Sequence, residues 1–195
     1  MLAPAHFMVG GTLAVEVSQP RSLSEAIPVF LIGGVSGIWA DCDMGNSKVS
    51  KLATKIIRFS LPVLVLMFLL QSKGFSFSNM QSVIRILLVI TAVAGTTVVN
   101  RVHKHRGPTH WLVTVLGIVV ACWFIMPKLT LIVGIGLLSH VGLDLLNEKA
   151  IALFAPFSKK KFKLGLCKSN GIVNAILPIL CIAVLFYRHL TINFK

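Results

Sequence analysis

The chain has 195 residues, of which 55% are hydrophobic and only 13% are charged. A soluble domain carries about 25% charged residues, so this composition excludes an ordinary water-soluble globule. The mean hydropathy of +0.86 predicts an integral membrane protein instead. The length allows one integral-membrane domain over residues 1–195.

Apolar runs, taken in chain order, predict an all-α polytopic membrane bundle of about five to seven hydrophobic helices. Two short runs come first, near residues 7–17 and 27–40. Five clearer runs follow, at residues 56–70, 83–99, 111–126, 129–146 and 172–187. A full crossing needs about 20 apolar residues, so we expect some of these helices to span only half of the bilayer.

The first two runs carry further signals. No basic residue precedes the first run and Glu16 interrupts it, which is unlike a cleaved signal peptide. We therefore expect the N-terminus to be retained. The second run contains a glycine-rich stretch, Gly33–Gly37, that lacks the spacing of a phosphate-binding loop. We expect these glycines to allow close packing of helices, as small residues do in membranes.

The placement of the 19 basic residues predicts an orientation. If the chain changes side at each run, 13 of them share one side, in the loops 48–58, 101–110 and 149–168, and 6 lie on the other. Basic residues near span ends favour the cytoplasm, so we expect these loops in the cytoplasm and the C-terminus on the opposite side of the membrane. The same rule accounts for the net charge, and without a nucleic-acid motif we expect no nucleic-acid partner.

The acidic residues indicate where function lies. The only aspartates are Asp41 and Asp43, at the end of an apolar run, and Asp144, inside another. A carboxylate at the centre of a membrane helix costs about 2.5–3.5 kcal/mol, so a cation or a base is expected beside it. His140 lies four residues before Asp144, and residues four apart share one face of a helix. That spacing suits two ligands of one metal ion.

The segment His105-Arg-Gly-Pro-Thr-His110 supplies two more histidines. Pro108 suits a first helical turn, so we expect His105 in a loop and His110 at the start of the next span. Under the alternating topology seven possible ligands gather at the cytoplasmic face. They are His6, Asp41, Asp43, His105, His110, His140 and Asp144. Seven exceed the four ligands of a typical zinc site, which predicts one or two divalent ions (zinc, manganese or iron) or residues that orient the ligands.

These motifs occur in an order that resembles the YdjM-like family of inner-membrane proteins, which are also described as LexA-regulated. The resemblance runs from His6 to about Asn174, and its most specific part is H-R-G-x-T-H followed by S-H-x-x-x-D. It implies a metal-dependent hydrolase. Met44 stands where the family often has histidine, and Asn174 where relatives often have glutamate, but neither change removes a predicted ligand.

The favoured hypothesis is a metal-dependent hydrolase acting at the cytoplasmic membrane face. A bound cation would lower the pKa of water and provide a nucleophile at neutral pH. Arg106 is predicted either to clamp a phosphate with its planar guanidinium, as a catalytic residue, or to anchor its loop at the cytoplasmic face. A lipid phosphoester is the expected substrate, because headgroups lie at this depth. The basic run at residues 159–163 either attracts anionic membrane lipids or sets the topology.

Two other hypotheses remain open at this point. A proton- or metal-coupled transporter is the alternative, because acids and histidines inside membranes also build proton relays. The clustering of the predicted ligands at one face disfavours it, as does the lack of matching broken helices. A non-catalytic protein with a structural metal is the third. Access of water would separate it from an enzyme, because a catalytic ion keeps an open position. The sequence leaves the oligomeric state open.

Overall fold

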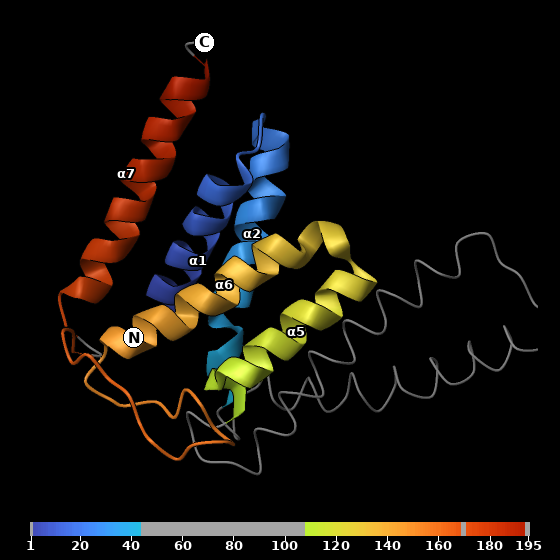
Figure 1. The fold of residues 1–195 in the computed structure, drawn as a ribbon. Helices are drawn as coiled ribbons and strands as arrows, with labels where there is room; N and C mark the ends of the chain where they lie inside the picture. The colour runs from blue at the N-terminus through green and yellow to red at the C-terminus, as the bar shows by residue number, and fades with distance from the viewer. Residues whose placement is uncertain (1, 44–107, 169–170, 194–195) are drawn as a thin grey trace, which may run out of the picture.

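The computed structural model describes residues 2–43, 108–168 and 171–193, which are coloured in Figure 1. This part of the chain is helical, with no sheet and only isolated β-bridges. The α-helices are α1 (Ala3–Ser18), α2 (Leu23–Trp39), α5 (Leu112–Ile125), α6 (Pro127–Leu146) and α7 (Val173–Asn193). Two 3-10 helices, η1 (Ala40–Asp43) and η3 (Pro108–His110), accompany them. The all-α prediction is confirmed, and the predicted runs 56–70 and 83–99 lie outside the described residues.

Prolines and a side-chain cap set the beginnings of the helices. α6 begins at Pro127 and η3 at Pro108, because proline has no N–H to donate and its fixed φ suits a first turn. At the start of α2, the Ser22 hydroxyl accepts a hydrogen bond from the Glu25 amide, 3.3 Å away. The Glu25 carboxylate accepts one from the amide of Arg21 in return. His110 ends η3 and is separated from the start of α5 by Trp111 alone, close to the start of the span expected for it.

The helices differ in how far they could reach across a bilayer. α6 has 20 residues and α7 has an apolar window of 18, so both are long and apolar enough to cross. α5 has only 14 residues, a length of about 21 Å against a hydrocarbon core of about 30 Å. Large apolar side chains on α5 and α7, such as Phe124 and Phe186, are exposed at 78% and 62%. A surface of this kind suits lipid better than water.

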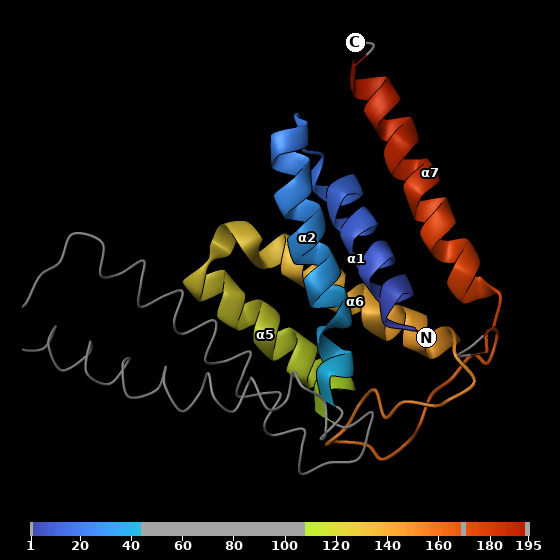
Figure 2. The ribbon, with the colours of Figure 1, turned by 180° about the vertical axis from the view of Figure 1, so that it is seen from behind.

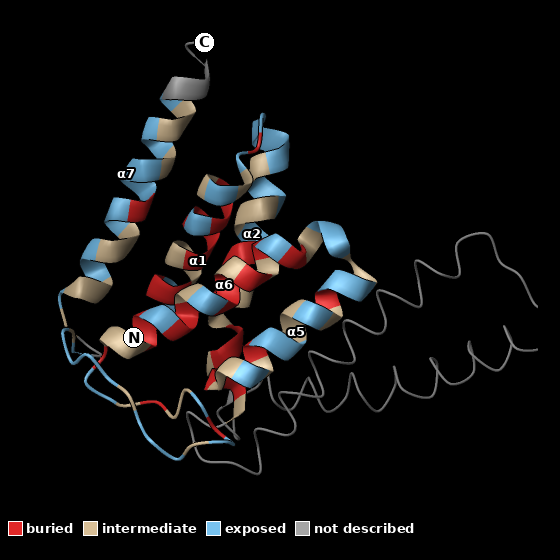
Figure 3. Ribbon diagram, viewed as in Figure 1, coloured by how far each residue is buried: buried red, intermediate tan, exposed pale blue. Residues whose placement is uncertain are grey.

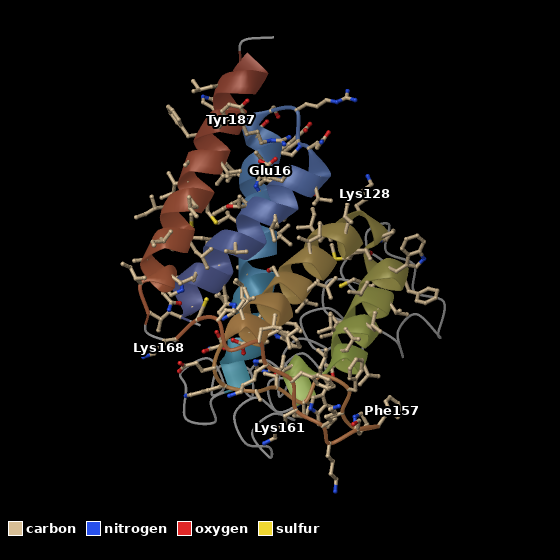
Figure 4. All side chains as sticks on the ribbon, turned by 60° about the vertical axis from the view of Figure 1, so that its left-hand side comes forward. Glu16, Lys128, Phe157, Lys161, Lys168 and Tyr187 are labelled. Atoms are coloured by element: carbon tan, nitrogen blue, oxygen red, sulfur yellow. The ribbon has the colours of Figure 1, made fainter. Side chains whose placement is uncertain are left out.

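The centre of the fold is the contact of α1, α2 and α6. α1 and α2 lie antiparallel, α6 crosses both, and α5 runs back beside α6 (Figures 1 and 2). Buried residues gather on the faces of α1, α2 and α6 that meet, whereas α7 is mostly exposed (Figure 3). α7 packs against α1, where Arg188 forms an ion pair with Glu16 at 3.4 Å, at the end of α1 away from the N-terminus (Figure 4).

Glycines let the three central helices approach one another. A Cβ added at Gly10 would lie 2.7 Å from the carbonyl oxygen of Gly33, and one added at Gly37 would lie 2.7 Å from that of His6. A Cβ at Gly136 would collide with the Gly33 carbonyl. The packing role predicted for Gly33–Gly37 is therefore confirmed. It brings the backbone of His6 directly against α2.

The segment between α6 and α7, residues 147–168, lies across the same end of the bundle as the N-terminus, η1 and η3 (Figures 1 and 4). We call it the basic strap. Its Ile151 is fully buried and joins the core formed by Trp39, Val115, Leu137 and Val141. The strap is therefore a fixed part of the fold at this end.

Replacing Gly136 with alanine should lower the free energy of unfolding by about 1–3 kcal/mol, because the added methyl overpacks α6 against α2. Gly142→Ala on the same helix is the matched control, since a Cβ there meets nothing within 4 Å. We expect it to be neutral or stabilising by up to about 1 kcal/mol. Thermal unfolding in detergent measures both. Equal melting temperatures for the two variants would contradict this packing role.

Candidate metal centre

Five ionisable side chains meet at the end of the bundle covered by the basic strap. They are His6 from α1, Asp41 from η1, His110 from η3, and His140 and Asp144 from α6. The three histidines are fully buried and the Asp144 side chain is 2% exposed, whereas that of Asp41 is 24% exposed. Residues far apart in the sequence thus form one compact cluster.

Asp144 lies against all three imidazoles. Its carboxylate oxygens are 3.3 Å from His110 Nε2, 3.6 Å from His6 Nε2 and 4.0 Å from His140 Nε2. Asp41 is slightly farther out, 3.8 Å from His140 Nε2 and 3.9 Å from His6 Nε2. The His6 ring stacks on the His140 ring, with a centroid distance of 4.0 Å. The Nε2 atoms of all three rings therefore face the two carboxylates.

The orientation of His140 is fixed by a backbone carbonyl. Its Nδ1 lies 2.7 Å from the carbonyl oxygen of Gly37 in α2. A carbonyl only accepts hydrogen bonds, so Nδ1 carries the proton and donates it. In the neutral ring Nε2 then holds the lone pair that a metal needs. Gly37 thus has two roles. Its carbonyl orients His140, and its lack of a side chain lets α1 pack closely against α2.

His110 is held in the same tautomer through a hydroxyl. The buried Thr109 Oγ1 donates its one hydrogen to the carbonyl of Ala40, 3.3 Å away. It can therefore only accept from His110 Nδ1, which lies 3.1 Å away. Nδ1 carries the proton, and Nε2 of His110 presents a lone pair to the cluster. This relay also joins η3 to the end of α2.

The lone pairs of His110 and His140 point at each other. Their Nε2 atoms are 3.2 Å apart, a distance at which two lone pairs repel unless a proton or a cation lies with them. Two nitrogens bound to one zinc ion at about 2.0–2.1 Å, at a tetrahedral angle, lie about 3.3 Å apart. Neither nitrogen of His6 has a hydrogen-bond partner within the described part of the chain. The facing lone pairs, the distance between the two nitrogens and the unpartnered nitrogens of His6 all fit a divalent cation.

Two groups of ligand atoms satisfy this geometry. His6, His140 and Asp144 form one, and Asp41, His110 and His140 form the other, with the atoms of each group within 4.8 Å of one another. Both groups could hold a metal ion, and both use His140. The cluster thus has the residue types and the spacing of a site that could hold a metal ion, and it brings together five of the seven residues predicted as ligands.

Asp41 has the most exposed side chain of the cluster. Burial raises the pKa of its carboxyl, His6 and His110 oppose that shift, and the Asp144 carboxylate adds to it. A cation beside Asp41 would favour the charged carboxylate. The other four side chains are at most 2% exposed, so among the five only Asp41 has appreciable exposed surface.

Three of the predicted site residues are not placed. Asp43 ends η1, but its side chain lies outside the described residues, as do His105 and Arg106 altogether. Sequence reasoning gave no role to Thr109 and saw Gly37 only as a packing residue. The available signal for Thr109 was its place beside His110 in a polar block, since a hydroxyl next to a ligand can orient it.

Comparison with known proteins places the chain among membrane proteins. The model of a family described as YdjM inner membrane protein matches residues 1–194, which includes every residue of the cluster. No curated protein and no solved structure matches the chain.

His140→Ala and Asp144→Ala should each lower the metal content and leave membrane insertion intact, because each removes a donor from the cluster. The measurement is metal analysis of purified protein after incubation with zinc, manganese or iron. His189→Ala, in α7, is the control that should retain metal. Unchanged metal content in both cluster variants would contradict the assignment.

Thr109→Val should weaken metal affinity about 10–100-fold, because it removes the hydroxyl that fixes His110 while keeping the shape of the side chain. Thr109→Ser keeps the hydroxyl and should bind metal as the wild type does. Competition with a coloured chelator gives both affinities. If the valine and serine variants bind metal equally, the relay through Thr109 does not orient His110.

Proposed function

We propose that this chain, which belongs to the YdjM inner membrane protein family, is a membrane-bound metal-dependent hydrolase. The observation that supports this most is the convergence of three buried Nε2 atoms on two carboxylates. His6, His110, His140 and Asp144 would hold a divalent cation, with Asp41 at its water-facing side. Such a cation activates water and polarises a phosphoryl or carbonyl oxygen.

The exposure of Asp41 supports catalysis over a structural metal. Structural zinc sites are closed by their protein ligands, whereas catalytic sites keep a position for water or substrate. Here the Asp41 side chain is 24% exposed, so a small group can approach the cluster from that side. Asp41 has the most exposed carboxylate of the cluster and is therefore placed to accept a proton from a water molecule there.

The proposed substrate is a lipid phosphoester. The cluster lies at the ends of α2 and α6, which is where a bilayer has its headgroups. A lipid would thus present its phosphate at the level of the cluster without leaving the membrane. Arg106 is proposed to clamp that phosphate, because its neighbour in sequence, His105, and nearby His110 belong to the same block.

We further propose that the centre faces the cytoplasm. The basic strap carries six lysines at the same end of the bundle as the cluster, and labelled Lys161 and Lys168 mark that end in Figure 4. Lys128, in the first turn of α6, lies toward the other end (Figure 4). The positive-inside rule then places the cluster on the cytoplasmic side.

A cysteine added after Lys195 should be labelled by an impermeant thiol reagent in intact spheroplasts, since this orientation puts the C-terminus outside. A cysteine placed at Lys161 in the basic strap should react only after the membrane is opened. The natural cysteines are first replaced with serine to remove their background. The reverse labelling pattern would contradict a cytoplasmic centre.

Metal-loaded protein should hydrolyse a phosphoester in mixed micelles, and the phosphate or alcohol released is measured against the metal-free protein. Arg106→Ala should keep its metal and lose about 10²–10³-fold in rate, because a clamp acts on the developing charge and not on the cation. His110→Ala should lose both metal and rate. The hydrolase proposal fails if fully loaded protein turns over no substrate in a broad phosphoester, ester and amide panel. Metal- or proton-dependent flux in proteoliposomes, abolished by Asp144→Ala, would then favour a transporter.

A further inference from the structure

The basic strap combines six lysines and a single acidic residue, Glu148, with exposed apolar side chains. Residues 149–168 contain no acidic residue and six lysines, all of them exposed. The lysines are Lys149, Lys159, Lys160, Lys161, Lys163 and Lys168. Between them, Phe157 is 85% exposed, Leu166 is 73% exposed and Leu164 is 64% exposed. Large apolar groups beside cations are the pattern of surfaces that enter the headgroup layer of a membrane.

This exposure does not come from a loosely attached loop. Within the strap, Ile151 and Phe162 exchange two backbone hydrogen bonds of 2.9 and 2.8 Å. The amides of Leu164 and Leu166 donate to the last carbonyls of α6, those of Leu145 and Leu146. The backbone is therefore fixed, and the strap holds its apolar and basic side chains outward in a set arrangement.

The strap is attached next to the metal centre at two points. Leu145, which accepts from Leu164 at 2.7 Å, directly follows Asp144. Leu153 accepts from the amide of Leu112 at 2.9 Å, two residues after His110. A molecule held on the strap therefore lies at the same end of the bundle as the cluster, close to η3 and α6, which carry candidate metal ligands.

We propose that the basic strap is a binding surface for anionic phospholipid, which seats the lipid's phosphate headgroup beside the metal centre. Lysines at a membrane surface attract anionic headgroups, by about five-fold in affinity for each lysine. Phe157, Leu164 and Leu166 are placed to contact the acyl chains below those headgroups. An acidic protein would match the lysines but would leave these apolar groups in water. The inference deepens the proposed function, on which its role in turnover rests, and makes the substrate an anionic lipid.

Titration of the purified full-length chain in neutral detergent tests the surface directly. The ligands are phosphatidylglycerol, phosphatidylcholine and inorganic phosphate, and bound lipid is counted by native mass spectrometry. The charge variant is Lys161→Gln/Lys163→Gln. Its matched control is Arg21→Gln/Lys128→Gln, which removes the same charge outside the strap. Phe157→Ser/Leu166→Ser tests the apolar contacts separately.

Wild-type protein should prefer phosphatidylglycerol to phosphatidylcholine, and the charge variant should lose about 25-fold in affinity for phosphatidylglycerol. The control variant should bind it as the wild type does. The apolar variant should lose affinity for both lipids. Equal loss in the control and charge variants, or no preference between the two lipids, would overturn the proposal. Inorganic phosphate that displaces phosphatidylglycerol at equal concentration would also overturn it, because the surface would then be a phosphate site.

Metal content and lipid binding separate the two proposals. The strap variants keep all five cluster residues, so they should bind metal as the wild type does. If the loaded wild type binds phosphatidylglycerol but hydrolyses nothing, the hydrolase proposal fails and the binding surface stands. If it hydrolyses phosphatidylcholine and phosphatidylglycerol equally well, and the charge variant does too, the surface proposal fails and the hydrolase stands.

Discussion

The fold is organised around an electrostatic constraint: three imidazoles and two carboxylates share one small space at the end of an apolar bundle. Uncompensated burial of an ion costs several kcal/mol even after the protein relaxes. The Nε2 atoms of His110 and His140 are 3.2 Å apart, a distance that requires a proton or a cation with their lone pairs. A divalent cation would compensate both the buried carboxylates, which it attracts, and the facing nitrogen lone pairs, which it accepts.

The packing of the central helices follows from that arrangement. His6 must come against α2 for its ring to stack on His140, and this requires a residue without a side chain at Gly37. The same Gly37 supplies the carbonyl that fixes the His140 tautomer. On the other side of the cluster, Thr109 uses the carbonyl of Ala40 to fix His110. The end of α2 therefore orients both histidines, and the close approach of helices is part of the site and not merely of the core.

Much of this could be predicted from the sequence, because hydropathy and spacing are local properties. The apolar runs gave the five described α-helices with ends shifted by a few residues, and the i, i+4 spacing put His140 and Asp144 on one face of α6. Charge alternation also predicted that His6, Asp41 and His110 would gather at one end. The Thr109–Ala40 contact could not be foreseen, because it joins residues 69 apart and depends on the angle at which helices cross. The backbone hydrogen bonds that fix the basic strap to α6 could not be predicted from the sequence for the same reason.

The most direct test of the metal centre is X-ray absorption spectroscopy on the purified wild-type chain, combined with metal analysis of the same sample. Two groups of donors, which share His140, could each hold an ion, so the expected result is one or two divalent ions per chain. Its spectrum should show several imidazole nitrogens together with carboxylate oxygens at about 2.0–2.2 Å. A chain purified with metal in excess that retains none would contradict a metal centre here, as would an ion whose ligands include no imidazole.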